Sequence, residues 1–343
     1  MTLATAIATG DLTQLPSRRD EDWRWTDLRG LIRVLPAASP AFDGDVGAGP
    51  FAADETVTIV NGHGPAAIAI PAGEARTVAL RVVAATDGTA HAARLSVTLG
   101  QGARLTLLES HEGRAASYLT QTDLDVSLGE DAALERIVLV ADHAEAVTIV
   151  DAAVTLAAGA SFDQTILTAG ARRQRIETRV SHPGQGAAVR LDGAYLLRDQ
   201  RHADLTTVVT HAGRDGTTSQ LTKGVVRDQA RGVFQGRIVV ERGADGTEAR
   251  MGHHALILSD RAEVDAKPEL LIFTDDVQCA HGNTVGALDE AAIFYARQRG
   301  MPEDVARAML TEAFVGEVVE RIEHEGAREI ARAWVSQQLG AGE

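Results

Sequence analysis

An internal repeat constrains the fold of this chain more than any other feature of its sequence. The segment VTLGQGA at residues 97–103 returns as VSLGEDA at 126–132, as VTLAAGA at 154–160, and more loosely at 180–187. The first valines of these copies are 29, 28 and 26 residues apart. Each copy is a short run of strand-forming residues followed by a turn in which Gly or Asp accepts a left-handed backbone. A strand and a turn that recur at this period are typical of a β-solenoid, whose turns bury their apolar faces only by stacking.

The strand signals extend over residues 51–286, which are predicted to form the solenoid core. Short runs rich in Val, Ile and Thr, such as residues 56–60, 147–150 and 237–240, are bounded by Gly, Asp, Asn and Pro. A β-sandwich or jelly roll also consists of many short strands and is the competing fold. Because a sandwich of about 200 residues or more with a constant period would be unusual, the repeat favours the solenoid.

Residues 1–50 have a mixed pattern and are predicted to form an N-terminal helical segment and a connector. The helix-like stretch covers residues 17–32 and begins with SRRD, a weak version of a capping box. A connector rich in Pro, Ala and Gly then continues to residue 50. Trp23 and Trp25 are two of the three tryptophans. They would either anchor the segment on a partner, as aromatic side chains do at interface hot spots, or pack on the chain's own solenoid.

Residues 287–343 are predicted to form a C-terminal helical domain. A helix over residues 288–299 is followed by Gly300, which suits the left-handed position after a helix, and Pro302 suits the start of the next helix. Between residues 303 and 329, eight acidic residues stand against three arginines. These acidic helices would either present a solvated face or match the charge of a partner.

Charge and cysteine content exclude several classes of function. A net charge of −15 disfavours binding to nucleic acid, because that affinity comes from Lys and Arg. The first residues lack the basic and apolar stretches of a signal peptide, and no stretch approaches the about 20 apolar residues of a membrane span. The single cysteine, Cys279, allows no internal disulfide. We therefore expect a cytoplasmic protein with neither a nucleic-acid nor a membrane partner.

The stretch DDVQCAHG at residues 275–282 holds the most informative polar side chains. If it forms a strand, Cys279 and His281 lie two residues apart and share one face. The pair would then share a thiophilic metal, or His281 would lower the pKa of the thiol. The alternative is a small buried cysteine beside a hydrogen-bonded histidine. Since iron–sulfur clusters take about four ligands, mostly thiolates, any cluster here would be shared with another chain.

The other polar clusters are interpreted as structural. His253 and His254 are adjacent, and adjacent strand residues face opposite sides, so they are not expected to form a metal pair. Asp275 and Asp276 diverge for the same reason and are expected in a turn instead of forming a glycosidase carboxylate pair. The remaining histidines considered show no recognisable ligand spacing: His182, His202 and His211. Because the phosphate loop, the nucleophile elbow and the H-E-x-x-H zinc helix are also missing from the sequence, we do not expect an enzyme.

Three blocks in the last third of the chain carry a recognisable pattern. They are RGVFQGRIVV at residues 231–240, the stretch 256–272 with LSD, AEV and KPEL, and residues 275–300 with C-x-H-G, TVG, FY and RG. These blocks resemble the SufB/SufD family of iron–sulfur cluster assembly scaffold proteins, and the tryptophan segment near residue 23 is similar to the family's N-terminal motif. The pattern D-D-V-x-C-x-H-G is similar to the SufD branch, since the SufB branch has an acidic counterpart there and usually more cysteines.

The resemblance implies a mainly β protein, with a right-handed parallel β-helix core, a short N-terminal helical segment and a C-terminal helical domain. It implies a non-catalytic subunit of the SUF scaffold that pairs with a SufB-like subunit and docks a SufC-like ATPase on its C-terminal helices. A nascent iron–sulfur cluster would form transiently at the interface between the SufB and SufD subunits, with no cofactor tightly bound to this chain alone. Carried over to this sequence, His281 is a candidate metal ligand and Cys279 is its neighbour.

Two other functions stay open from the sequence. One is a β-helix carbohydrate-active enzyme, although such proteins are typically secreted and carry grouped carboxylates. The other is a homodimer of the isolated chain that acts as a metal carrier. Sizing the product of a mixture with SufB-like and SufC-like subunits would separate the homodimer from the heteromeric scaffold.

Overall fold

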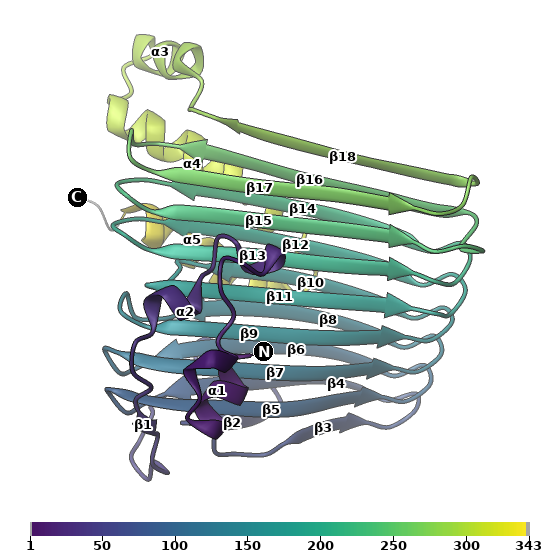
Figure 1. Cartoon of the computed structure of the whole chain (residues 1–343). Coiled ribbons are helices and arrows are strands. Elements are labelled where there is room, and N and C mark those ends of the chain that lie inside the picture. The colour runs from purple at the N-terminus through teal and green to yellow at the C-terminus, as the bar shows by residue number, and fades with distance from the viewer. Residues whose placement is uncertain (1, 341–343) are drawn as a thin grey trace.

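The computed structural model describes residues 2–340, and most of them belong to two parallel sheets (Figure 1). The strands of the first sheet are β1 (Ala37–Ala38), β3 (Ala67–Ile70), β5 (Thr89–Leu99), β7 (Tyr118–Leu128), β9 (Val147–Leu156), β11 (Arg173–His182), β13 (His202–His211), β15 (Arg231–Val240) and β17 (Glu263–Ile272). The strands of the second sheet are β2 (Glu55–Val60), β4 (Ala75–Ala84), β6 (Arg104–Gly113), β8 (Ala133–Ala141), β10 (Ser161–Thr168), β12 (Ala188–Leu197), β14 (Thr217–Val226), β16 (Thr247–Ile257) and β18 (Val277–Gly286).

Successive strands of the chain alternate between the two sheets from one end of the stack to the other. The first sheet runs β1-β5-β7-β9-β11-β13-β15-β17, with β3 also beside β5, and the second runs β2-β4-β6-β8-β10-β12-β14-β16-β18. Neighbouring strands in both sheets are parallel, as in the pairs β5–β7 and β16–β18. The predicted parallel β-solenoid is therefore confirmed, and the sandwich is not the fold.

The sequence repeat corresponds to the stacking of the turns. Val97 pairs with Val126, Val126 with Val154, and Val154 with Val180. All four valines are at most 2% exposed and belong to one continuous apolar core. Burying a side chain of this size contributes roughly 1.5–3 kcal/mol, so the stacked column is a substantial part of the stability.

The turns after these strands use one backbone geometry. One turn residue in each copy of the repeat has a left-handed backbone conformation. It is the sixth residue in the first three copies and the equivalent turn residue in the fourth: Gly102 (φ 65°), Asp131 (φ 55°), Gly159 (φ 67°) and Gly186 (φ 69°). Gly adopts this conformation without steric cost, and Asp tolerates it better than most residues. The Gly/Asp alternation in the sequence therefore has a direct structural cause.

The N-terminal segment differs from the prediction. Residues 17–32 contain only a 3-10 turn, η2 (Glu21–Trp23), and one short helix, α2 (Leu28–Leu31), preceded by the unpredicted α1 (Leu3–Thr9) and the 3-10 turn η1 (Leu12–Gln14). The segment lies across the first sheet (Figure 1), where contacts with the solenoid decide its path. The buried Thr26 hydroxyl donates to Asp204 at 2.6 Å, so a continuous helix here is replaced by an anchored, irregular chain.

Trp23 packs on the chain's own solenoid. The Arg175 guanidinium lies 4.6 Å from the centre of its ring, and Trp23 contacts an apolar cluster between the segment and the first sheet. The Trp25 carbonyl accepts a hydrogen bond from His202 at 3.1 Å. Of the two roles left open by the sequence, internal anchoring is the one observed for Trp23.

Three helices follow the last strand: α3 (Glu290–Gln298), α4 (Glu303–Val319) and α5 (Glu325–Gly340). Gly300 is left-handed as expected (φ 86°), whereas Pro302 caps α4 instead of forming its first residue. Helices α4 and α5 cover the outer face of the second sheet with apolar residues such as Val315 and Trp334. Within residues 2–340, no helix is long and apolar enough to cross a lipid bilayer.

Candidate functional site at the open end of the solenoid

The stack stops at β17 and β18 without a covering turn. Each is the last strand of its sheet, at the top of the stack in Figure 1, and no strand among residues 2–340 pairs with the outer edge of either. Most residues of β18 are exposed, whereas the strands in the middle of the stack are largely buried. An unpaired edge presents free backbone N–H and C=O groups to another chain.

Cys279 and His281 lie on β18 and face the interior of the solenoid. In the register with β16, Cys279 pairs with Ala249 and His281 pairs with Met251. Ala249 and Met251 are 0% and 3% exposed and belong to the core. Because paired residues of neighbouring strands point the same way, the thiol and the imidazole share the inward face. They are accessible only because no further turn lies above them.

The two side chains have different environments. Cys279 is half-buried against the core, and burial raises the pKa of its thiol, opposed by a hydrogen bond with the Ala249 backbone. His281 is exposed, and its imidazole makes no hydrogen bond with any residue in the described part of the chain. The expectation that His281 would lower the thiol pKa is therefore wrong for this chain alone. The hydrogen-bonded histidine of the structural alternative is not observed either.

Apolar side chains surround this pair. Leu270 and Ile272 of β17 pair with the buried Ile238 and Val240, so they too face inward. Ile272 is 39% exposed, whereas Val240 is 0% exposed. We call the inward-facing residues of the last turn the open end: Leu270, Ile272, Val277, Cys279 and His281. Its apolar members were not predicted from the sequence, although they lie in the last strand-forming stretch before the helical region, which was a usable signal.

By themselves these residues cannot complete a metal site. Among the described residues, no group of three or more His, Cys, Asp and Glu side chains is arranged to hold a metal ion. The open end supplies one sulfur and one nitrogen donor, which is a ligand set for a thiophilic metal but not a full coordination sphere. Any further ligands must come from another chain or from the bound species.

The adjacent histidines are separated as predicted. His253 is fully buried, stacks on Phe234 with ring centres 4.6 Å apart, and lies 2.9 Å from the Tyr195 hydroxyl. His254 faces the other side, 2.7 Å from the Thr284 hydroxyl. The two carboxylates at residues 275 and 276 lie in the bend between β17 and β18, which confirms the turn assignment.

One histidine pair was not found from the sequence. His182 and His211 occupy neighbouring strands, with Nε2 of His182 2.5 Å from Nδ1 of His211, and His211 also contacts Thr218 at 2.9 Å. Both rings are fully buried, and His202 lies apart from them. Their separation of 29 residues equals one turn of the repeat, which was the available signal.

A second exposed surface lies on the C-terminal helices. Its residues form what we call the helical patch, with exposed fractions of 46–62%: Phe294, Tyr295, Val305 and Met309. These side chains belong to α3 and α4, which follow directly after β18. Large apolar groups gathered on exposed helices mark a candidate contact surface for another protein.

Sequence comparison places these features in a known group of proteins. Residues 82–314 match the family model described as the SufBD core domain of SUF-system FeS cluster assembly. The iron–sulfur cluster assembly protein SufD of Escherichia coli is 28% identical, with 96% of this chain and 90% of that protein covered. A SufBD family protein of Mycobacterium leprae is 26% identical over 96% of this chain and 92% of that protein. SufD of Bacillus subtilis is 33% identical over 38% of this chain and 30% of that protein.

Proposed function

This chain belongs to the SufBD family of SUF-system iron–sulfur cluster assembly proteins, and from that premise we propose that it is a SufD-like, non-catalytic scaffold subunit whose open end pairs with a SufB-like subunit. The observation that carries the proposal is the exposure of an inward-facing thiol and imidazole at the uncovered last turn. A thiolate and an imidazole are both ligands for iron, and both groups lie where a second chain would cover them.

Pairing at the open end follows from the physical chemistry of an unfinished solenoid. The apolar members of the open end, such as Ile272 and Leu270, remain partly in water in the isolated chain. A second chain that stacks on them would bury this surface at roughly 25 cal/mol per Å². The free edges of β17 and β18 would hydrogen-bond with its strands, as in other cases of β-strand addition.

In this arrangement the nascent cluster is cargo held between two subunits. Cys279 and His281 supply two ligands, and the SufB-like subunit supplies the others. Because burial raises the pKa of the Cys279 thiol, the free chain carries the protonated form. Binding of iron replaces that proton with a sulfur–iron bond and releases the proton to solvent, since the thiolate is the ligand.

The helical patch is the proposed docking surface for a SufC-like ATPase, which would act in the cytoplasm together with this chain. Its apolar side chains are exposed on α3 and α4, and the first turn of α4 also carries the acidic residues Glu303 and Asp304. The helices are tied to the solenoid by ion pairs, including Lys223–Glu317 at 2.7 Å and Arg321–Asp192 at 3.1 Å. Movement of α4 on ATP hydrolysis would therefore reach the second sheet.

The experiment that tests the ligand role compares two histidine variants. We expect His281→Ala to assemble with the SufB-like and SufC-like subunits but to lower the iron and sulfide content of the complex by about tenfold, the order seen when a metal site loses a ligand or its support. His254→Ala is the matched control, because His254 lies on the neighbouring strand and faces away from the core. A normal iron and sulfide content in the His281→Ala complex would show that His281 is not a ligand of the cluster.

Size measurement of the same mixtures tests the pairing. A complex that contains this chain and the SufB-like subunit supports the proposal. A homodimer of this chain that persists in the presence of the SufB-like subunit would contradict it and favour the metal-carrier alternative.

A further inference from the structure

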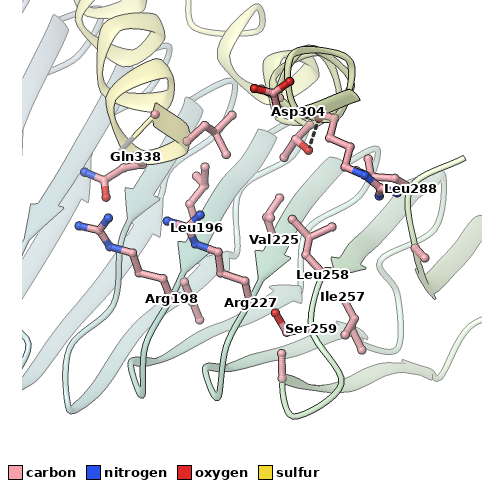
Figure 2. Close-up of a pocket in the computed structure, with 18 of the residues that line it drawn as sticks. Leu196, Arg198, Val225, Arg227, Ile257, Leu258, Ser259, Leu288, Asp304 and Gln338 are labelled. Atoms are coloured by element: carbon pink, nitrogen blue, oxygen red, sulfur yellow. Dashed lines mark hydrogen bonds between the residues drawn. The ribbon is translucent and has the colours of Figure 1, made fainter. Parts of the chain in front are cut away.

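A cavity of about 790 Å³ lies between the second sheet and the C-terminal helices (Figure 2). One side is formed by the ends of β12, β14 and β16, with Leu196, Val225 and Leu258, and the other by the helical region, with Leu288 and Leu339. No residue of the open end lines this cavity. Its volume and its mainly apolar walls are typical of sites for small organic molecules.

Two arginines from consecutive turns of the solenoid line this cavity. Arg198 and Arg227 directly follow Leu197 and Val226, which pair with each other on neighbouring strands. The backbone N–H of Arg227 donates to the backbone carbonyl of Leu197 at 3.0 Å. Neighbouring strands are about 4.8 Å apart, so the two side chains start one strand spacing from each other. Figure 2 shows both side chains reaching from their turns toward the helices.

The Arg227 charge is not neutralised by the chain. Within residues 2–340, its guanidinium forms no ion pair and no side-chain hydrogen bond. A third arginine of the cavity, Arg307, is held differently, since it pairs with Glu290 and Glu303 at 3.1 Å each. The carboxylates of Asp260 and Asp304 also line the cavity. Arg198, the neighbouring arginine, lies 3.9 Å from the Asp199 carboxylate. Arg227 therefore keeps an unneutralised positive charge for an anion from outside the chain.

The turns around Arg198 and Arg227 form a ridge of charged side chains. Burial and the neighbouring Arg198 lower the pKa of Arg201, and burial and Arg231 lower the pKa of Arg173. Carboxylates offset part of this positive charge, since Arg172 lies 3.8 Å from Glu145 and Arg231 lies 2.8 Å from Asp265. Among the arginines that line the cavity, Arg227 is the one where an anionic ligand gains most.

We propose that this cavity binds an amphipathic organic anion, with its apolar part against Leu196, Val225 and Leu339 and its carboxylate or phosphate head between the Arg198 and Arg227 guanidiniums. Arg recognises both head groups through paired hydrogen bonds. The ligand would touch the solenoid and α5 at once. Because it binds only when these parts are packed together, it would raise the thermal stability of the chain.

Calorimetry with short-chain probes tests the proposal. Octanoate and octyl phosphate carry the two candidate heads, and octanol has the same apolar chain without charge. We expect both anions to bind the wild-type chain at least about tenfold more tightly than octanol. The uncharged alcohol cannot form the charge-assisted hydrogen bonds that a carboxylate or phosphate forms with the arginines. The tighter of the two anions identifies the head group.

Three variants locate the binding. Arg227→Gln is expected to weaken anion binding by about tenfold, whereas Arg172→Gln, an exposed ridge position outside the cavity, changes it less than about twofold. Leu258→Trp fills the cavity at a residue that is 37% exposed and is expected to abolish binding with the charge intact. Equal binding of octanol, equal effects of Arg227→Gln and Arg172→Gln, or loss of binding with Ile272→Asp at the open end would each overturn the proposal.

Discussion

The two ends of the solenoid are built from the same kind of strands but finish in opposite ways. At the first turn, Ile59 of β2 and Ile70 of β3 are only 2% and 3% exposed, although each lies at the end of the stack. At the last turn, Ile272 is 39% exposed and His281 is exposed. The first turn therefore closes over its own core, whereas the last turn leaves its inward-facing side chains in solvent.

The difference shows that an open end is not an unavoidable property of a solenoid. The short strand β3 brings Ile68 and Ile70 into the core cluster, so this chain is able to cover one end by itself. At the other end the helices α4 and α5 cover the outer face of the second sheet and leave the last turn open. An uncovered core that contains a thiol and an imidazole is the surface on which the proposed pairing with another chain rests.

The largest effect is expected from a charge placed in the closed end. Ile70→Asp buries a carboxylate and removes apolar contacts, which should lower the free energy of unfolding of the isolated chain by about 4 kcal/mol. Denaturant titration of the isolated chain measures this loss. An unchanged midpoint would mean that the first turn is not closed in solution, and the comparison between the ends would fail.

The matched change at the open end should act on the partner instead of the fold. Ile272→Asp is expected to lower the free energy of unfolding much less than Ile70→Asp, because position 272 is 39% exposed and the new carboxylate keeps contact with water. It is expected to weaken binding of the SufB-like subunit by about 100-fold. Val34→Asp, at a residue that is 78% exposed in the N-terminal connector, is the control and should bind normally. Equal binding by both variants would contradict pairing at the open end.

A smaller effect is expected from pH, since the closed part of the stack holds neutral histidines. Burial lowers the pKa of His182 to about 4 and the pKa of His202 to about 3, compared with about 6.5 in the unfolded chain. The stability that depends on the neutral form is complete above pH 6.5 and falls as the pH approaches the folded values, by about 1 kcal/mol for each histidine at pH 5.5. Asp192 opposes this trend, because burial raises its pKa to about 6.

Denaturant titrations at pH 7.5 and 5.5 test this dependence. The wild-type chain should be less stable at pH 5.5, and His182→Gln should reduce the difference by about 1 kcal/mol. A stability that does not vary between these pH values would show that the interior histidines are not buried in solution.

The parts of the fold that repeat along the sequence could be predicted from it. The spacing of the Val97 and Val126 copies sets the stacking register directly, and the left-handed turn residues such as Asp131 follow from the Gly/Asp pattern. The shared face of Cys279 and His281 was also predictable, because a two-residue separation on a strand leaves no other arrangement. These features depend on local geometry alone.

Features that depend on contacts between distant turns could not be predicted in the same way. The buried Arg136–Glu109 ion pair at 2.8 Å joins residues on two strands, and nothing in either local sequence marks it. The predicted helix at residues 17–32 was wrong because contacts such as Thr26–Asp204 override local preference. The apolar members of the open end, such as Leu270 and Ile272, were missed for a related reason, since their exposure depends on where the stack stops.

Alkylation of Cys279 reports directly whether a partner covers the open end, because the chain contains no other cysteine. Iodoacetamide should modify Cys279 in the isolated chain and react at least about tenfold more slowly once the SufB-like subunit is bound, as expected when an interface excludes water and reagent. Peptide mass spectrometry distinguishes this thiol from those of the partner. Equal rates in the free chain and in the assembled complex would show that the open end stays uncovered and would contradict the account.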